Sequence, residues 1–295
     1  MIRYPFDTLA VLAEIARIDP RWKSKAERRT ATFVKARAYG EKSSLWSTIK
    51  PVYMAVQANK CVFCERQFEN ERYGKIEFDV EHYRPKSSVK AWPDAKSHPK
   101  LQYEYDTGAA LDDGYYWLAY DLENYAASCK ACNSALKSNY FPVGGDRGTP
   151  SAGFRTLLQE KPFLCYPLGQ LDADPEDLVS FVATIAKPRA SDGHDRERGQ
   201  IIIDFFDLNG REVLHQQRAQ MIAMVGGALA AREAGTASAV DNQVVTKIDD
   251  PALPHASCLR SFKRLFEEDP GAGLRVWEKC RLYAMNQTAS GPPEL

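Results

Sequence analysis

The chain has 295 residues and no net charge at neutral pH, so its overall electrostatic field does not mark it as a nucleic-acid-binding protein. No apolar run reaches the roughly 18 residues of a membrane helix, and the N-terminal residues lack the apolar core of a secretion signal. We therefore expect a cytoplasmic protein without membrane association. In that compartment paired cysteines favour metal binding over disulfides.

Three helices are predicted at the N-terminal end. The first covers residues 4–18 and ends at Asp19-Pro20, the second covers about 24–39, and the third covers 44–58 with a break at its proline. The aromatic residues of the third helix, including Trp46, are interpreted as core. Residues 21–42 carry eight basic and two acidic side chains. Two interpretations of this surplus stay open: a solvated helix face, or a surface that contacts phosphates.

Two strands and a short helix are predicted in the central part of the chain. Apolar and acidic residues alternate from Ile76 to His82, which indicates a strand. Residues 124–129 are expected to form its hairpin partner, and residues 132–138 to start a short helix. Residues 87–114 are polar and rich in turn-forming residues, so they are predicted to be an insertion loop.

The C-terminal part is predicted to be mainly helical. Helices are expected at about 196–207, 210–230, 258–268 and 273–286, while residues 231–257 show no clear pattern. The predicted fold class is therefore α+β, predominantly helical. We expect three regions: a helical region at 1–58, a cysteine-rich core at 59–145, and a helical region at 146–295 that can serve as a docking surface for a partner.

Two Cys-x-x-Cys pairs predict a structural zinc site. Cys61 and Cys64 form the first pair, and Cys129 and Cys132 form the second. Zinc prefers four soft ligands in a tetrahedron, and four thiolates leave no open coordination position for catalysis. The alternative is two unrelated pairs. The long separation between the pairs means that a substructure must lie between them.

The residues between and beside these pairs offer the groups that phosphodiester hydrolysis needs. His82 is the candidate general base, because imidazole titrates near neutral pH. Glu81 and Asn133 offer hard oxygen ligands for a catalytic Mg²⁺ or Mn²⁺ ion. Neighbours on a regular strand point to opposite faces, so Glu81 and His82 can share a site only if the strand ends or bulges there. Asp79 is expected to have a structural role.

Three basic residues are candidates for holding a phosphate of a nucleic acid: Arg84, Lys86 and Lys137. Each candidate in this region also has an ordinary alternative. A His beside a Glu is usually a surface ion pair, and an Asn after a Cys is usually a helix cap. The prediction depends on their joint placement within the frame of paired cysteines.

The order Cys-x-x-Cys, acid-His-x-x-Pro, Asn, Cys-x-x-Cys-Asn-x-x-x-Lys resembles the HNH endonucleases, which have a ββα-metal fold. The resemblance implies that His82 is the general base and that Asn133 ligates the catalytic ion in place of a second His. It also implies that Asn124 braces the hairpin loop through backbone hydrogen bonds. Glu81 stands where the family often has Asp, one methylene shorter.

Further segments resemble the HNH proteins of Septu-type anti-phage systems and of some retron defence operons. These segments are Val80–Ser87, Tyr116–Asp121, Phe141-Pro142, Glu160–Leu164, Asp174–Glu176 and Asp207–Glu212. Together they span about residues 60 to 225. The resemblance implies an ABC-type ATPase as a partner. The expected target is nucleic acid, with DNA expected first and RNA left open.

Two other functions stay open at this point. One is a nuclease that acts alone, as a restriction-type or mobile-element HNH enzyme. The other is a zinc-stabilised binding module without catalysis. A nicking assay with divalent metal separates catalysis from binding, and an ATPase in the gene neighbourhood separates the defence protein from the enzyme that acts alone.

Overall fold

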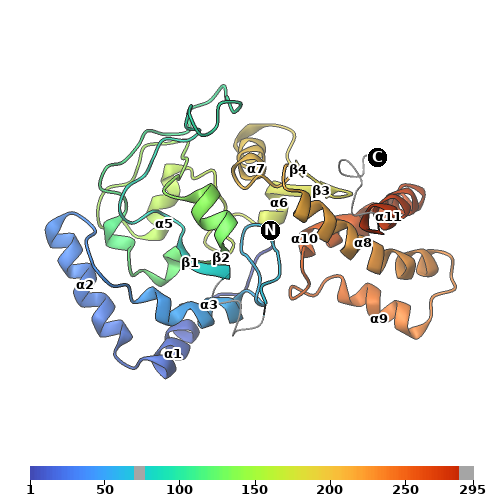
Figure 1. The fold of residues 1–295 in the computed structure, drawn as a ribbon, viewed down its shortest axis with the longest axis horizontal. Helices are drawn as coiled ribbons and strands as arrows, with labels where there is room; N and C mark the ends of the chain where they lie inside the picture. The colour runs from blue at the N-terminus through green and yellow to red at the C-terminus, as the bar shows by residue number, and fades with distance from the viewer. Residues whose placement is uncertain (70–76, 286–295) are drawn as a thin grey trace. The chain divides into compact units, whose positions relative to one another are not determined.

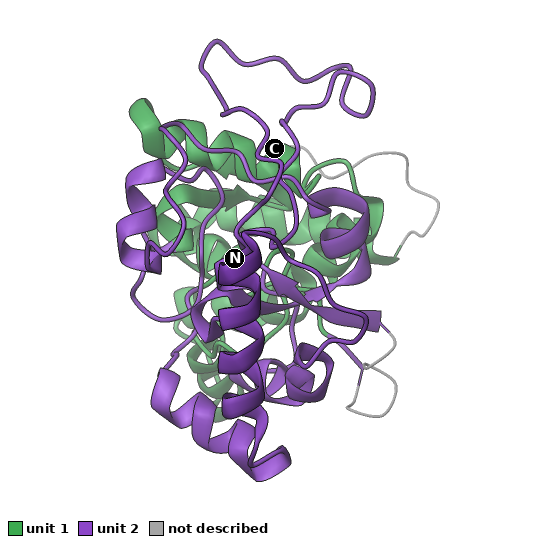
Figure 2. Ribbon diagram, turned by 90° about the vertical axis from the view of Figure 1, so that its left-hand side faces the viewer, with its two compact units in different colours: residues 1–2, 63–67, 175–295 green, residues 3–62, 68–174 purple. Residues whose placement is uncertain are grey.

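The computed structural model describes residues 1–69 and 77–285, which form two compact units (Figures 1 and 2). Unit 2 contains residues 3–62 and 68–174, and unit 1 contains residues 1–2, 63–67 and 175–295. Helices dominate, and two small antiparallel sheets accompany them. This composition confirms the predicted α+β class. The division into three functional regions stays a prediction.

Unit 2 begins with the predicted N-terminal helices. Helix α1 (Thr8–Ile18) starts where the Asp7 carboxylate accepts a hydrogen bond from the Ala10 amide, at 2.9 Å. Helix α2 (Trp22–Ala36) is shifted towards the N-terminus relative to the prediction, because Arg37 adopts a left-handed conformation with φ 54° and ends it. The third predicted helix is divided at its proline, as expected, into η1 (Trp46–Ile49) and α3 (Lys50–Val56).

The sheet of unit 2 pairs the two predicted strands. Strand β1 (Phe78–His82) runs antiparallel to β2 (Tyr125–Cys129), with Phe78 opposite Cys129 and His82 opposite Tyr125. Ile76, the predicted start of the first strand, lies outside the described residues. The short helices η2 (Tyr116–Leu118) and η3 (Leu122–Asn124) precede β2.

The helix predicted after the second strand is present, but it is wider than an α-helix. Element η4 (Ala131–Lys137) is a π-helix, and the Ser138 amide bonds the Asn133 carbonyl at 2.6 Å, five residues back. π-Helical turns are rare and occur mostly at functional sites. Residues 87–114 contain neither a helix nor a regular strand, as predicted. Unit 2 continues through α5 (Phe154–Leu157) and η5 (Leu158–Glu160).

Unit 1 contains the predicted C-terminal helices and, among its described residues, four elements that were not expected. Helices α7, α8, α10 and α11 lie at Gly193–Phe205, Glu212–Glu233, Ala256–Glu268 and Pro270–Met285. The hairpin of β3 (Val179–Val182) and β4 (Ile185–Pro188), the short α6 (Pro175–Leu178), and α9 (Ala239–Lys247) were missed.

A buried polar network joins the turn of this hairpin to the turn between α7 and α8. The Asn209 side chain accepts from the Ala186 amide at 2.7 Å and donates to the Ala186 carbonyl at 2.9 Å. The His215 ring bonds Thr184 Oγ1 at 2.9 Å and the Asn209 carbonyl at 2.8 Å. The Arg218 guanidinium donates to the Thr184 carbonyl at 2.9 Å. His215 thus has a structural place in unit 1.

Replacing Asn209 with alanine is expected to lower the free energy of unfolding by about 2–4 kcal/mol, because both backbone groups of Ala186 lose their partner. Chemical denaturation monitored by circular dichroism measures the change. Asn242→Ala is the matched control, since Asn242 is exposed and its side chain donates, among the described residues, to the carbonyl of Ser238 at the start of its own helix. Equal losses in the two variants would contradict the role of the network.

Candidate active site and metal centre

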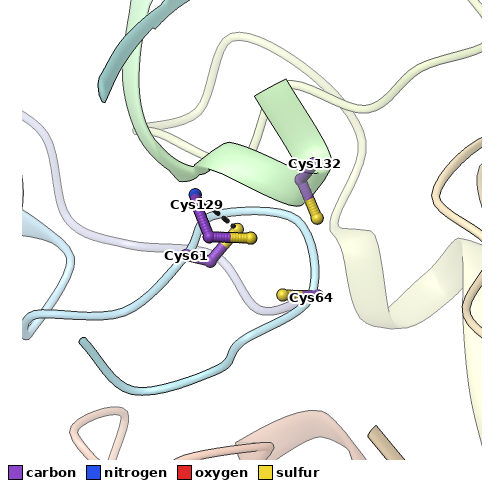
Figure 3. Close-up of side chains that lie close together, drawn as sticks. All are labelled: Cys61, Cys64, Cys129 and Cys132. Carbon is purple, nitrogen blue, oxygen red and sulfur yellow. Dashed lines mark hydrogen bonds between the residues drawn. The ribbon is translucent and has the colours of Figure 1, made fainter. Parts of the chain in front are cut away.

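The four predicted zinc ligands lie together. The sulfur atoms of Cys61, Cys64, Cys129 and Cys132 all lie within 4.8 Å of one another and are buried (Figure 3). The Cys129 amide also donates to Cys61 Sγ at 3.4 Å. Tetrahedral zinc with Zn–S bonds of about 2.3 Å requires sulfurs roughly 3.8 Å apart, which this spacing allows. The cluster can therefore hold a structural metal such as zinc.

The local structure places the cysteine cluster beside the sheet. Cys129 is the last residue of β2, and Cys132 lies in the first turn of η4. The Val62 amide, next to Cys61, bonds the Ala127 carbonyl of β2 at 3.0 Å. A metal bound at the cluster would therefore fix the start of η4 against the end of β2.

A pocket of about 370 Å³ lies at the end of β1. Its lining comes from β1, from the turn after β1, from η4 and from η1, and includes Trp46, Asp79, Glu81, His82, Lys86 and Asn133. Glu81 and His82 are neighbours, and both reach the pocket because β1 ends at His82. The structure thus brings together four of the residues predicted for the site.

His82 is held in one orientation. Its ring packs edge-to-face against Trp46 and Tyr125, with ring centroids 4.7 and 5.0 Å away. Its Nε2 lies 3.1 Å from the Ala119 carbonyl oxygen. Because a carbonyl can only accept, Nε2 carries the hydrogen and the lone pair of the neutral ring is on Nδ1. Burial, together with the nearby charge of Lys86, lowers the pKa of His82 well below its usual value. The imidazole is therefore neutral at neutral pH.

Glu81 is paired with a buried lysine. The Glu81 carboxylate lies 2.6 Å from Lys137 Nζ, which also donates to the His82 carbonyl at 2.9 Å. Burial raises the pKa of Glu81, and the ammonium of Lys137 opposes that rise. Lys137 is fully buried and does not line the pocket. Its contact with a phosphate stays a prediction, whereas its observed contacts orient Glu81.

Asn124 connects the turn after β1 to the start of β2. Its Oδ1 accepts from the Arg84 amide at 2.8 Å, and its Nδ2 donates to the carbonyls of Arg84 and Leu118 at 3.0 and 3.2 Å. The Arg84 side chain points elsewhere: it is fully buried, and its Nε donates to Glu160 at 3.0 Å. Arg84 lies outside the pocket, so its predicted phosphate contact also stays a prediction. Lys86 is the predicted phosphate-binding residue that lines the pocket.

The sequence did not indicate several of the pocket residues, among them Trp46 and Asn139. Trp46 comes from the N-terminal helices and was interpreted as core, yet it is half-buried and lines the pocket. Asn139 follows η4 and carried no motif. Asp79 also lines the pocket, and its carboxylate forms an ion pair with Lys50. Its structural role stays a prediction.

The chain is similar to two Septu proteins of Bacillus mycoides (strain KBAB4). It is 26% identical to Septu protein PtuA over 167 residues, which are 55% of this chain and 19% of that protein. It is 27% identical to Septu protein PtuB over 200 residues, which are 65% of this chain and 57% of that protein. The matches therefore span less than two thirds of either relative. No protein-family model and no solved structure matches the chain.

The predicted resemblance to Septu proteins is confirmed by these two matches. Neither name specifies a nuclease or a retron. Within residues 1–69 and 77–285, no helix is long and apolar enough to cross a membrane.

Proposed function

We propose that the protein is a metal-dependent HNH endonuclease of a Septu-type anti-phage defence system. It hydrolyses phosphodiester bonds of nucleic acid, DNA in preference to RNA, beside an ABC-type ATPase. The observation that carries the proposal is a neutral His82 with its Nδ1 lone pair available, in one pocket with Glu81, Lys86 and Asn133. The order of strand, strand and helix around the pocket supports a ββα-metal core.

His82 would act as the general base. Its Nδ1 takes a proton from the attacking water, and the positive charge that forms on the ring is stabilised by the Ala119 carbonyl at Nε2. The rings of Trp46 and Tyr125 keep the imidazole in this orientation. Lys86, in the same pocket, binds an oxygen of the reacting phosphate.

Glu81 and Asn133 would hold the catalytic divalent ion. Both line the pocket beside His82, and a carboxylate with an amide oxygen is a donor set that suits Mg²⁺ or Mn²⁺. A bound ion would supply positive charge that stabilises the phosphorane and the leaving oxygen. The Lys137 ammonium orients the Glu81 carboxylate, and Asn124 fixes the turn that carries the lysine and arginine after β1.

A nicking assay on supercoiled plasmid tests the activity. With the proposed ATPase partner and with Mg²⁺ or Mn²⁺, the protein is expected to convert supercoiled DNA to the nicked or linear form, and a chelator should stop the reaction. Co-purification from the native operon tests the partner. Cleavage without the ATPase would favour a nuclease that acts alone. Binding of DNA and RNA without any cleavage, with the partner present, would contradict the nuclease and favour the binding module.

A further inference from the structure

Two lysines lie near Glu81, and their surroundings differ. Lys137 donates to the Glu81 carboxylate and to the His82 carbonyl. Lys86 lines the pocket, and no carboxylate or carbonyl oxygen of the described residues lies within ion-pair or hydrogen-bond distance of its ammonium. Its Nζ lies instead over two aromatic rings, 4.6 Å from the centroid of Trp46 and 5.2 Å from that of Tyr39.

An aromatic face holds a cation differently from a carboxylate. The ring attracts the ammonium through its quadrupole and neither neutralises the charge nor uses a hydrogen-bond donor. An ion pair with a carboxylate would neutralise the charge and would also use a hydrogen-bond donor. The aromatic contacts therefore leave the three N–H donors of Lys86 available for an incoming anion, although its side chain is held against protein.

Trp46 also contacts the candidate base. Its ring meets the His82 ring edge-to-face, with centroids 4.7 Å apart, while Lys86 lies over the same indole at 4.6 Å. One side chain thus sets the position of two groups in the pocket. Trp46 belongs to η1, and Tyr39 lies in the segment between α2 and η1, so both come from outside the cysteine-rich core.

We propose that Trp46 and Tyr39 are positioning residues that hold Lys86, and through Trp46 also His82, against the reacting phosphate. This inference rests on the proposed nuclease function. The N-terminal helical region then completes the active site, and a core that lacks it would bind the phosphate with a misplaced lysine.

A double-mutant cycle tests whether Trp46 acts through Lys86. Trp46→Leu is expected to lower kcat/KM by about 5- to 30-fold, the range of one desolvated cation–π contact, and Trp46→Phe by less because a ring face remains. In a Lys86→Met background, the effect of Trp46→Leu should shrink at least threefold, since the cation is already absent. Full additivity would overturn the proposal.

Trp92→Leu is the matched control. Trp92 is a buried tryptophan that stacks on Tyr103 and does not line the pocket. Its replacement should lower the stability of the fold without lowering kcat/KM of the folded protein. The effects of Trp92→Leu and Lys86→Met on kcat/KM should be additive. Rates are normalised to folded protein from thermal unfolding. If Trp92→Leu lowered kcat/KM as much as Trp46→Leu does, the loss of packing alone would explain both effects and the positioning role would be overturned.

A measurement without catalysis keeps this inference separate from the nuclease proposal. A methylene group close to aromatic faces has its NMR signal shifted upfield by the ring currents. In protein labelled at lysine, the Lys86 ε-methylene signal is expected to be shifted upfield, to lose the shift in Trp46→Leu, and to keep it in Trp92→Leu. An unshifted Lys86 signal in the native protein would overturn the positioning role even if cleavage is found. A shifted Lys86 signal in a protein that cleaves no nucleic acid would support the position of Lys86 against the aromatic rings and contradict the proposed nuclease function.

Discussion

His82→Ala is expected to lower the rate of phosphodiester hydrolysis by about 10²- to 10⁴-fold, the usual effect of losing a general base. Metal content and nucleic-acid binding should be unchanged, because the imidazole contacts neither the cysteine cluster nor Lys137 directly. The measurement is single-turnover cleavage of one substrate over a range of Mg²⁺ and Mn²⁺ concentrations. Added metal should not restore the rate, since it supplies no base.

Variants of the two proposed metal ligands should respond to the same metal titration differently from His82→Ala. Asn133→Ala removes a metal ligand, so its lost activity should recover in part at higher metal concentration. For Glu81 the better replacement is Gln, which keeps the contact with Lys137 and removes the charge, because an unpaired buried lysine would destabilise the fold. Rescue of His82→Ala by metal would reassign this residue as a ligand.

Cys129→Ser is expected to abolish metal binding and to unfold the region between residues 61 and 137. Structural zinc contributes apparent binding free energies of about 10–16 kcal/mol in small zinc peptides, and a two-stranded sheet with one short helix cannot supply a comparable core. Elemental analysis should find one zinc per native chain and much less in the variant. Hydrogen exchange of β1 and β2 reports the unfolding.

Cys165→Ser serves as the control for this variant. Cys165 is also buried in unit 2, but it lies outside the cysteine cluster and its thiol donates to the Ala173 carbonyl at 3.4 Å, a bond that a hydroxyl can replace. It should retain zinc and fold normally. Native protein purified without chelator that contains no zinc would contradict the structural metal.

The parts of the site that the sequence predicted are those that depend on local spacing. The paired cysteines and the alternation that ends at His82 are short-range patterns, which can be recognised without knowing what the rest of the chain contacts. The burial of Lys137 is a different case. A lysine in an isolated short helix is read as solvent-exposed, and only the approach of β1 to η4 gives its ammonium the Glu81 carboxylate.

The missed elements have similar explanations. Strands β3 and β4 contain four residues each, too few for an alternation to stand out. Helix α9 carries a capping box between Ser238 and Asp241, which the sequence displays, but its polar composition gave no apolar stripe. Trp46 reaches the pocket through the packing of η1 on β1, a contact that no local pattern encodes.

The π-helical form of η4 gives the segment between Cys132 and Lys137 one residue more than an α-helix would need. A π-helical turn is closed by a hydrogen bond to the fifth residue back, whereas an α-helical turn is closed by a bond to the fourth. Deleting the exposed Ala135 would therefore let the turn close as an ordinary α-helical turn, and the residues after it would keep nearly the same position around the helix axis. Cys132 would stay with the other cysteines and Lys137 beside the Glu81 carboxylate. Homologues of this chain should therefore include sequences that lack one residue here and retain both the cysteine and the lysine.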